Sequence, residues 1–274
     1  MTTQKTLPRI TSRRTFLRKS KVEYADHAIN FVKGCKHGCR YCYAMTGEIQ
    51  KHKTKDYEEW TQPKIASNIN EVLAKEIPKL KKKIKFVFLS LMHDPFMKDG
   101  PEVINQSLRI IKNLNKNILR CVTLTKGIYP RILTDTTKFS DKNYYGISII
   151  SLDEEFRKKF EPGTASYIDR IKSLKRLHDH GLKTWVSIEP YPSPNLVQQD
   201  LSKLLESIKF VDIIIFGKNN HDKASRQYCN KHNKNFYKDC IKTVIKFCKN
   251  NGIKYHIKAK TAGKLNKRTA RVFY

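Results

Sequence analysis

Three cysteines stand close together in the segment GCKHGCRYCYA, residues 34–44. Cys35, Cys39 and Cys42 are separated by three and then by two residues, and no fourth cysteine lies beside them. Structural zinc sites close four ligands, commonly as two paired half-sites. His37 lies inside the segment and could bind a metal, but this spacing is not that of a usual zinc knuckle. The cysteines of the last part of the chain are scattered and form no second pair: Cys229, Cys240 and Cys248.

A [4Fe–4S] cluster suits this loop better than zinc. Thiolates bind the irons of such clusters, so three cysteines on a tight loop can bind three of the four irons. The fourth iron then stays open to another molecule, just as catalytic metal sites keep one position vacant. We expect Gly34 and Gly38 to let the loop wrap closely around the inorganic core.

The elements that must position this loop alternate along the chain. Seven short β-branched runs are apolar on both faces, which predicts buried parallel strands. They cover residues 27–32, 85–91, 119–125, 144–150, 183–189, 211–217 and 253–259. Helical patterns lie between them at 67–80, 100–115, 166–181, 199–208 and 236–252. This order predicts an α/β fold, either an open doubly wound sheet or a full or partial barrel. In both, chemistry gathers at the carboxyl ends of the strands, where the cysteine loop follows the first run.

Several details of these elements can be predicted. Pro78 should end the first helix early because proline lacks the N–H that a helix interior requires. Gly181 is placed to terminate the helix before it. At a strand end, His93 and Asp94 could act as acid and base, but we favour a role in capping the helix that follows. Cys121 lies in the middle of a run and is predicted to be a buried, inert thiol. The segment FGKNNH, residues 216–221, closes a strand and could touch the substrate.

The chain is strongly basic, with a formal net charge of +30 over 274 residues. Residues 1–22 and 240–274 contain no acid at all. Such asymmetry is typical of proteins that bind a polyanion, although a solvated coat of lysines would give the same composition. No stretch approaches the roughly 18 apolar residues of a membrane span, and the N-terminus lacks the apolar part of a secretory signal. We therefore expect a cytoplasmic protein whose cysteines are thiols or metal ligands.

The spacing of Cys35, Cys39 and Cys42, with Tyr41 before the last, resembles the signature of the radical S-adenosylmethionine (SAM) superfamily. The words INFVKGCKHGCRYCYA, HDPF, TLTKG and SIEP resemble its spore photoproduct lyase-like branch, often labelled DNA repair photolyase, over roughly residues 27–217. The resemblance implies a partial (β/α)6 TIM-like barrel of parallel strands, here with an additional C-terminal strand. It also implies that the three cysteines bind a [4Fe–4S] cluster whose open iron binds SAM.

The resemblance also implies residues that contact SAM. Tyr41 matches an aromatic residue near the adenine, and Ser90 matches polar groups near the methionine amino end. Lys126 is positioned for the methionine carboxylate, and Ser148 and Glu189 for the ribose. The usual Gly-Gly-Glu motif is replaced by SLMHDP. For the branch's hydrogen-donor cysteine the only candidate is Cys121, for which we favour the role of an inert thiol, so the catalytic residues stay unassigned.

The sequence thus predicts a radical SAM enzyme that forms a 5′-deoxyadenosyl radical and takes hydrogen from a substrate. The basic ends suggest nucleic acid as substrate, and a reducing partner such as flavodoxin or ferredoxin is expected. The alternatives are a nucleic-acid-binding protein with a structural metal loop, or radical chemistry on a peptide or small metabolite. We divide the chain into a basic N-terminal extension (1–25), a radical SAM core (26–218) and a basic C-terminal helix–strand extension packed on the core (219–274).

Overall fold

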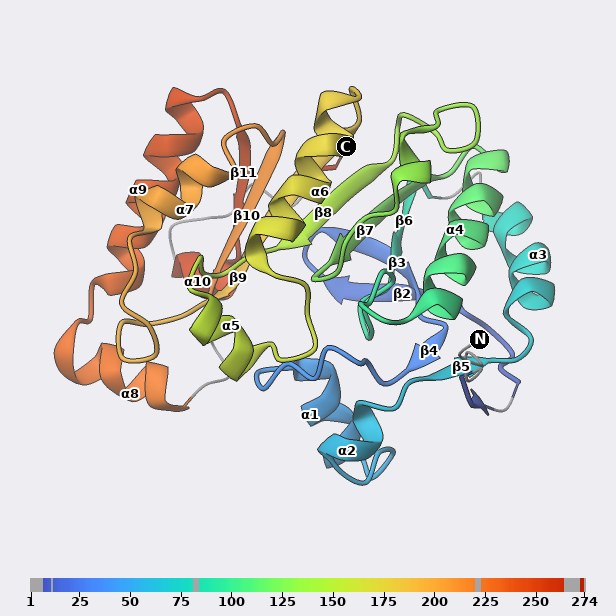
Figure 1. Cartoon of the computed structure of the whole chain (residues 1–274), viewed down its shortest axis with the longest axis horizontal. Coiled ribbons are helices and arrows are strands. Elements are labelled where there is room, and N and C mark those ends of the chain that lie inside the picture. Colours follow the sequence, from blue (N-terminus) through green and yellow to red (C-terminus); the bar gives the residue numbers. More distant parts are fainter. Residues whose placement is uncertain (1–6, 11, 81–83, 220–222, 264–271, 274) are drawn as a thin grey trace, which may run out of the picture.

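A curved sheet of eight strands occupies the centre of the structure (Figure 1). The computed structural model describes residues 7–10, 12–80, 84–219, 223–263 and 272–273. In spatial order the strands are β11 (Lys254–Ile257), β10 (Ile213–Lys218), β9 (Lys183–Tyr191), β8 (Tyr144–Ser148), β7 (Arg120–Thr125), β6 (Phe86–Leu89), β3 (Ala25–Ile29) and β2 (Leu17–Val22). All neighbours are parallel except β2 and β3, which are antiparallel. The predicted partial barrel is confirmed, with β3 to β10 as its six core strands and β11 as the additional one.

The N-terminal region holds strands that the sequence does not predict. β2 has the sequence LRKSKV, in which only the first and last residues are apolar, so it carries no signal of a buried strand. A second, small sheet has the order β1 (Arg9–Ile10), β5 (Lys64–Ala66) and β4 (Val32–Lys33). These strands are too short for a periodic pattern. Because β2 belongs to the main sheet, part of the region predicted as an extension contributes to the barrel; the division into three parts stays a prediction.

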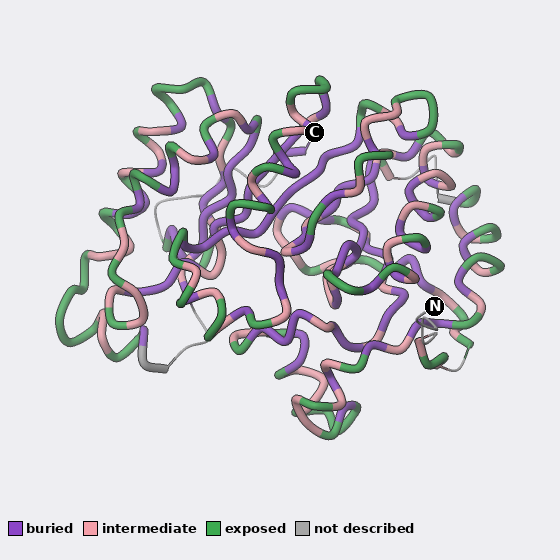
Figure 2. Tube along the Cα trace, viewed as in Figure 1, coloured by how far each residue is buried: buried purple, intermediate pink, exposed green. Residues whose placement is uncertain are grey.

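Helices surround the outer face of the sheet. The five predicted helices are present as α3 (Ile69–Leu80), α4 (Pro101–Lys116), α6 (Tyr167–Asp179), α7 (Leu201–Ser207) and α9 (Phe236–Asn250). The helical elements that the sequence did not predict are α1 (Tyr43–Gln50), α2 (Tyr57–Trp60), the 3-10 turn η1 (Arg131–Thr134), α5 (Glu154–Phe160), α8 (Lys223–His232) and α10 (Ala259–Ala262). Figure 2 shows buried strands and helices whose outer sides are exposed, as amphipathic helices on a buried sheet require. No helix within the described segments has the length and apolar character needed to traverse a bilayer.

The structure tests the predicted ends of two helices. The expectation that Pro78 ends its helix early is wrong: Pro78 lies inside α3, which continues to Leu80. Proline cannot donate to the carbonyl four residues before it, so α3 tolerates the loss of one bond in its last turn. The helix α6 does end as predicted, since Gly181 adopts a positive φ of 75° and its N–H donates to the carbonyl of His178 at 2.8 Å.

Aromatic side chains fill one end of the barrel interior. Phe273, from the C-terminal end of the chain, is 1% exposed, and its ring centroid lies 5.2 Å from those of Tyr144 and Trp185. It also packs against Phe86, at 6.0 Å. Val272 belongs to the same buried cluster. These residues close the amino-terminal end of the barrel.

The opposite end of the barrel is hollow because the inward side chains become small. Side chains two residues apart share a face of a strand. Tyr144 is therefore followed inward by Gly146 and Ser148 on β8, and Trp185 by Ser187 on β9. Both serines line a cavity at the carboxyl ends of the strands. The sequence of the strands thus gives a barrel that is packed with side chains at its amino-terminal end and open at its carboxyl-terminal end, the barrel mouth.

Candidate active site

The cavity at the barrel mouth has a volume of about 350 Å³ and brings all the predicted site residues together. Its lining includes the three cysteines of the loop, Cys35, Cys39 and Cys42, and the five predicted SAM contacts, Tyr41, Ser90, Lys126, Ser148 and Glu189. These eight residues come from the loop after β4 and from the ends of four other strands. Sites at the carboxyl face of a barrel are assembled in this way.

The cysteine loop is held by the short helix α2. The N–H of Cys35 donates to the carbonyl of Trp60 at 2.9 Å. Gly34 has a φ of 89°, and a Cβ there would lie 2.5 Å from the Trp60 oxygen. Gly38 has a φ of 53°, and its Cβ would lie 2.4 Å from the Tyr57 hydroxyl. The two glycines therefore permit close packing against α2; the expectation that they let the loop wrap around an inorganic core stays a prediction.

The thiols are suited to a cluster rather than to a single ion. Cys35 and Cys39 are buried, Cys42 is half-buried, and all three are free. Burial raises the pKa of Cys35 to about 12 and that of Cys39 well above its usual range, so both thiolates need a positive partner. Within the described residues, no three His, Cys, Asp or Glu side chains converge on one metal ion. In a [4Fe–4S] cluster each thiolate binds a different iron, so the three thiolates need not converge on one point.

His37 positions the loop and is not a spare ligand. Its Nδ1 lies 3.2 Å from the carboxylate of Asp94, and its Nε2 accepts the N–H of Lys98 at 3.0 Å. Both ring nitrogens are therefore occupied, and the buried ring ties the cysteine loop to the segment after β6.

Asp94 joins three segments of the site, which corrects its predicted role as a helix cap. Its carboxylate accepts the Thr125 hydroxyl at 2.6 Å and the N–H of Lys126 at 2.7 Å, in addition to its contact with His37. Burial opposes its ionisation, but His37 and these donors outweigh burial and lower the pKa of Asp94 to about 2. The helix that follows begins instead with Gly100 as its N-cap. Asp94 thus fixes Lys126 relative to the cysteine loop.

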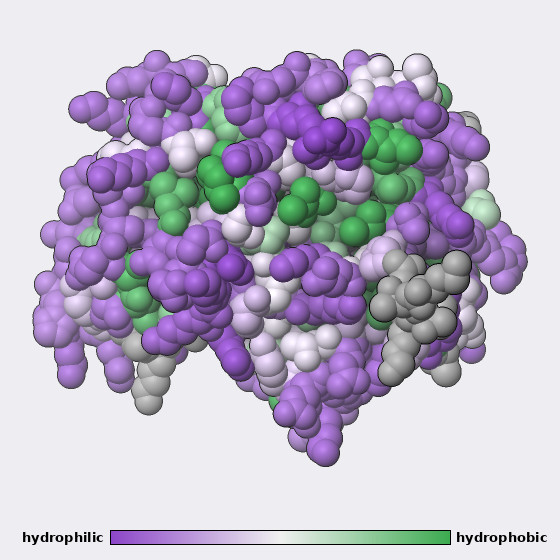
Figure 3. Space-filling model, in the orientation of Figure 1, coloured by the Kyte–Doolittle hydropathy of each residue, from purple (hydrophilic) through white to green (hydrophobic). Residues whose placement is uncertain are grey.

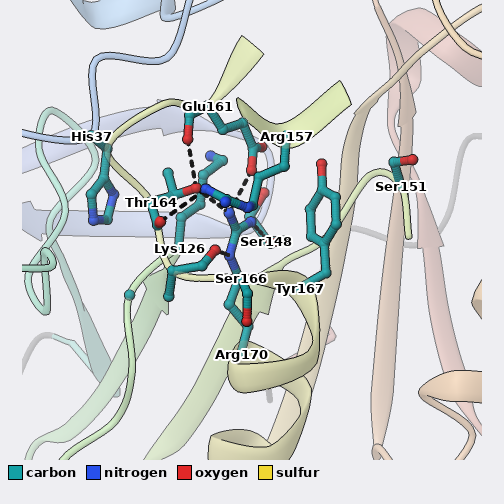
Figure 4. A network of polar contacts seen from close by, with 12 residues as sticks. His37, Lys126, Ser148, Ser151, Arg157, Glu161, Thr164, Ser166, Tyr167 and Arg170 are labelled. Carbon is teal, nitrogen blue, oxygen red and sulfur yellow. Dashed lines mark hydrogen bonds and ion pairs between the residues drawn. The ribbon is translucent and has the colours of Figure 1, made fainter. Parts of the chain in front are cut away.

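A completely buried ion pair lies behind the cavity (Figure 4). Arg170 of α6 donates from Nη2 to Glu161 at 2.6 Å and from Nη1 to the carbonyl of Ser148 at 2.9 Å. Both side chains are 0% exposed. The hydroxyl of Tyr41 donates to the other oxygen of Glu161. The pair therefore connects a tyrosine of the cysteine loop with the end of β8.

The turn that carries Glu161 also clamps the loop through its backbone. The N–H of Arg40 donates to the carbonyl of Phe160 at 2.9 Å, and the N–H of Gly163 donates to that of His37 at 3.0 Å. Two residues on, the N–H of Ala165 donates to the carbonyl of Lys126 at 3.0 Å. One turn thereby sets the positions of the cysteine loop and of the end of β7.

The side chain of Lys126 places an ammonium group in the cavity that holds the cysteines. The ammonium of Lys126 lies 5.6 Å from the centre of the Tyr41 ring. Burial opposes its charge, but Cys39 and Glu161 outweigh burial and raise the pKa of Lys126. The ammonium is therefore charged and available to an anionic group in the cavity.

Glu189 and Ser148 line the far wall. The Ser148 hydroxyl is 3.5 Å from the carbonyl of Glu189. Burial raises the pKa of the Glu189 carboxyl, and the ammonium of Lys258 lies 3.8 Å from it. This wall therefore offers a carboxylate and a hydroxyl, groups that can bond to sugar hydroxyls.

Ser90 lies in the cavity wall, but its hydroxyl is already engaged. It lies 2.8 Å from Nδ1 of His93 and 3.3 Å from the side-chain oxygen of Asn30. His93 is buried, and its Nε2 has no partner among the described residues. Burial lowers the pKa of His93 to about 3, so the ring is neutral. The spare polar atom at this position thus belongs to His93, whose predicted capping role is not observed.

Sequence reasoning did not name Tyr43 or Lys258, which line the cavity, and it found Lys218 only as part of the segment FGKNNH. Tyr43 directly follows Cys42, and the two lysines end β10 and follow β11, so the rule that strand ends carry function could have identified them. Cys121 is buried and does not line this cavity, as predicted. Within FGKNNH, Lys218 lines the cavity, whereas Asn220 and His221 lie outside the described residues.

Comparisons of sequence agree with this site. The family model of the Radical SAM superfamily matches residues 29–208. Uncharacterised protein ORF301 of Acidianus two-tailed virus is 27% identical over 213 residues, covering 72% of this chain and 68% of that protein. Uncharacterised protein MJ0683 of Methanocaldococcus jannaschii is 27% identical over 172 residues, covering 62% of each.

Comparisons of structure give the same fold. A spore photoproduct lyase variant with bound AdoMet and dinucleoside spore photoproduct aligns with a TM-score of 0.66 at 15% identity, covering 90% of this chain and 80% of that one. A spore photoproduct lyase complexed with dinucleoside spore photoproduct aligns with a TM-score of 0.66 at 16% identity and the same coverage. At these identities the likeness establishes a shared fold.

Proposed function

Because the chain belongs to the radical SAM superfamily, we propose that Cys35, Cys39 and Cys42 each bind one iron of its cluster and leave the fourth iron open to SAM. The cofactors of this enzyme are a [4Fe–4S] cluster and SAM. When bound, they supply reductive cleavage of SAM to methionine and a 5′-deoxyadenosyl radical that abstracts hydrogen from a substrate. The observation that carries the residue roles is that the three thiols and the five candidate contacts line one cavity.

The charges around the cavity favour specific roles. Lys126 binds the carboxylate of SAM, since its ammonium is held beside Cys39 and Tyr41. Tyr41 lies along the adenosine, and Ser148 and Glu189 bond to the ribose. Ser90 acts through His93, because the Ser90 hydroxyl already contacts that ring. The unpartnered Nε2 of His93 contacts the amino end of SAM.

We propose a nucleic acid as the substrate. The net charge of +30 supports a polyanionic partner. The similar spore photoproduct lyase structures contain a dinucleoside spore photoproduct, which is consistent with this class of substrate. A peptide or small metabolite is the second candidate. The enzyme works in the cytoplasm, where a flavodoxin or ferredoxin supplies its electron; small acidic electron carriers are attracted to a basic surface.

The residue roles can be tested with anaerobically reconstituted protein. Saturating SAM should change the EPR spectrum of the reduced cluster, and 5′-deoxyadenosine should accumulate. Lys126→Met should weaken SAM binding roughly tenfold or more, since a hydrogen bond to a charged group contributes about 1.5–3 kcal/mol. Lys116→Met, at an exposed position in the last turn of α4, is the matched control. Equal SAM affinity in both variants would exclude the proposed role of Lys126.

The substrate proposal needs a separate test. Single-stranded DNA, RNA and a mixture of peptides would each be incubated with reduced enzyme and SAM, and 5′-deoxyadenosine would be quantified. We expect an oligonucleotide to raise the yield above the uncoupled rate and to appear as a modified product. A rise with peptides alone would transfer the proposal to the second candidate.

A further inference from the structure

A second cavity, about 600 Å³ in volume, opens beside the barrel mouth. Its walls come from the segment before β2, from β2 and β4, and from α1 and the loop after it. One acid, Glu48, lines it. Four cations also line it: Arg13, Arg18, Lys33 and Lys53. We call this cavity, defined by those four cations, the basic cleft. Hydrophilic residues cover most of the face seen in Figure 3, so surface charge alone does not distinguish a site; a concave arrangement of cations does.

Three of the four cations of the basic cleft have no ion-pair partner among the described residues, while the fourth, Lys33, lies 4.0 Å from Glu59. Arg13 is half-buried, and its Nη1 donates to the carbonyl of Asn30 at 3.1 Å. Among the described residues, no carboxylate lies within ion-pair distance of Arg13, Arg18 or Lys53. Burial and then the charge of Arg18 lower the pKa of Arg13. Two guanidinium groups that repel each other across a cavity would be stabilised by an anion between them.

A buried donor in the same wall also lacks a partner. Trp60 lines the basic cleft and is 1% exposed, and its indole Nε1 has no hydrogen-bond partner among the described residues. An indole nitrogen can only donate. A buried donor left unpaired costs about 1–3 kcal/mol. The wall of the cleft therefore holds an unpaired donor whose nitrogen is itself shielded from solvent.

The basic cleft adjoins the cavity of the cysteines. Met92 lines both. Asn30 links their walls, since its side-chain oxygen accepts the N–H groups of Leu91 and Met92 at 2.9 Å while its carbonyl accepts from Arg13. A linear polyanion lying in the cleft could therefore reach the barrel mouth by crossing one side chain.

We propose that the basic cleft binds backbone phosphates of a single nucleic-acid strand whose adjoining nucleotide enters the SAM cavity over Met92. This inference rests on the proposed function and locates its substrate. Arginine suits the task because its planar fork matches two phosphate oxygens. Lysines on an edge strand such as β2 also discourage aggregation, but that purpose does not require a half-buried arginine that lines a cavity.

The test uses two double variants that remove the same charge. Arg18→Gln with Lys53→Gln alters exposed side chains of the cleft, while Lys116→Gln with Lys172→Gln alters exposed side chains of α4 and α6. Binding of labelled single-stranded DNA would be followed by anisotropy across a salt series. We expect the cleft variant to lose about 1.4 from the slope of log K against log salt, since each single-strand phosphate contact contributes roughly 0.7. An equal loss in the control pair would overturn the proposal in favour of a diffuse lysine coat.

Fluorescence and a competing anion complete the test. Trp60 and Trp185 are the two tryptophans, and Trp185 is fully buried in the barrel. Oligonucleotide binding should change the emission of the wild type but not of Trp60→Phe. If inorganic phosphate matched the oligonucleotide in affinity, the cleft would be an isolated anion site and the proposal would fail. Formation of 5′-deoxyadenosine without substrate should be unchanged in both double variants. If the wild type formed no 5′-deoxyadenosine, the proposed function would be contradicted, but the result on nucleic-acid binding would still hold.

Discussion

At the scale of single residues, the surroundings of the cysteines decide what they can bind. Burial keeps Cys35 and Cys39 protonated in the absence of a cation, because a thiolate in a low dielectric environment needs compensation. The other candidate ligand, His37, is held by Asp94 and Lys98. Ionisation of Cys35 and Cys39 therefore requires an electropositive group beside them, and the loop offers no fourth thiol.

Each of the three cysteines should be necessary for cluster assembly. Changing Cys35, Cys39 or Cys42 to alanine leaves a second iron without its protein ligand, so the cluster should be lost. Iron and sulfide content and the brown absorbance of anaerobically reconstituted protein would measure this. Cys229→Ala, at a half-buried position outside the cavity, is the control and should retain a full cluster. If Cys229→Ala failed to assemble a cluster, the assignment of the open iron would be contradicted.

His93 should make stability depend on pH. In the folded protein its pKa is lowered by burial from 6.5 to about 3, so only the unfolded chain binds a proton between these values. Stability is therefore complete above about pH 6.5 and should fall by about 2 kcal/mol between pH 7.5 and pH 5. Urea unfolding at a series of pH values would measure the fall, and His93→Asn should flatten it. A slope unchanged by the substitution would assign the effect to another group.

At the scale of elements, the turn between α5 and α6 organises the site more than any strand does. It bonds to the backbone of the cysteine loop at two points and to the end of β7 at a third. Its Glu161 receives Tyr41 and the guanidinium of Arg170, so a residue from α6 stabilises a residue of the loop. Burial opposes the charge of Glu161, but Arg170 and Lys126 outweigh burial and lower the pKa of this carboxyl. The pair is therefore ionised within the protein interior.

Breaking this pair should be costly. Glu161→Gln leaves a buried, uncompensated guanidinium and should reduce the free energy of unfolding by about 3–5 kcal/mol. Adding Arg170→Met removes the unpaired charge, so the double variant should be more stable than the sum of the single changes predicts. Urea unfolding would measure both. Glu155→Gln, which breaks an exposed pair with Lys158 on α5, is the control and should have little effect. Additive losses would mean that the two side chains do not act as a pair.

At the scale of the whole molecule, both ends of the chain complete the barrel. Glu23, at the turn after β2, accepts from the N–H of Ala259 at 3.0 Å and contacts His256 of β11 at 2.9 Å. The two edge strands of the sheet are thereby connected. Phe273 occupies the barrel interior between strands from several parts of the chain. The C-terminal residues thus support the floor beneath the cavity that holds the cysteines.

Phe273 should matter for stability and not for SAM binding. Phe273→Ala removes a fully buried ring and should cost about 3–5 kcal/mol, the usual range for such a cavity. Thermal or urea unfolding would measure the loss. Ile128→Ala, at a position 45% exposed, is the control and should change stability little. SAM affinity should be preserved at temperatures where the variant is folded, because Phe273 does not line the cavity and contacts its wall only from behind, through Tyr24. A large loss of SAM affinity would contradict this separation.

The sequence by itself determined the residues with strong local signatures. The three cysteines are recognisable by their spacing, and the strands by short apolar runs, because a buried parallel strand needs both faces apolar. The family resemblance identified Lys126, Ser148 and Glu189, and their position at one edge follows because parallel strands deliver their last residues to the same edge. None of this requires knowledge of which distant segments touch.

Only the tertiary structure decided how these residues are held. The partners of Tyr41 and Asp94 lie far away in sequence, and their bonds depend on the packing of α6 and of the end of β7 against the cysteine loop. β2 and the closing Phe273 have no periodic pattern of their own, because their burial is created by the barrel that they complete. The basic cleft is likewise a product of folding: Arg13 and Lys53 are separated by many residues, and their charges combine only because β2 and the α1–α2 segment enclose one space.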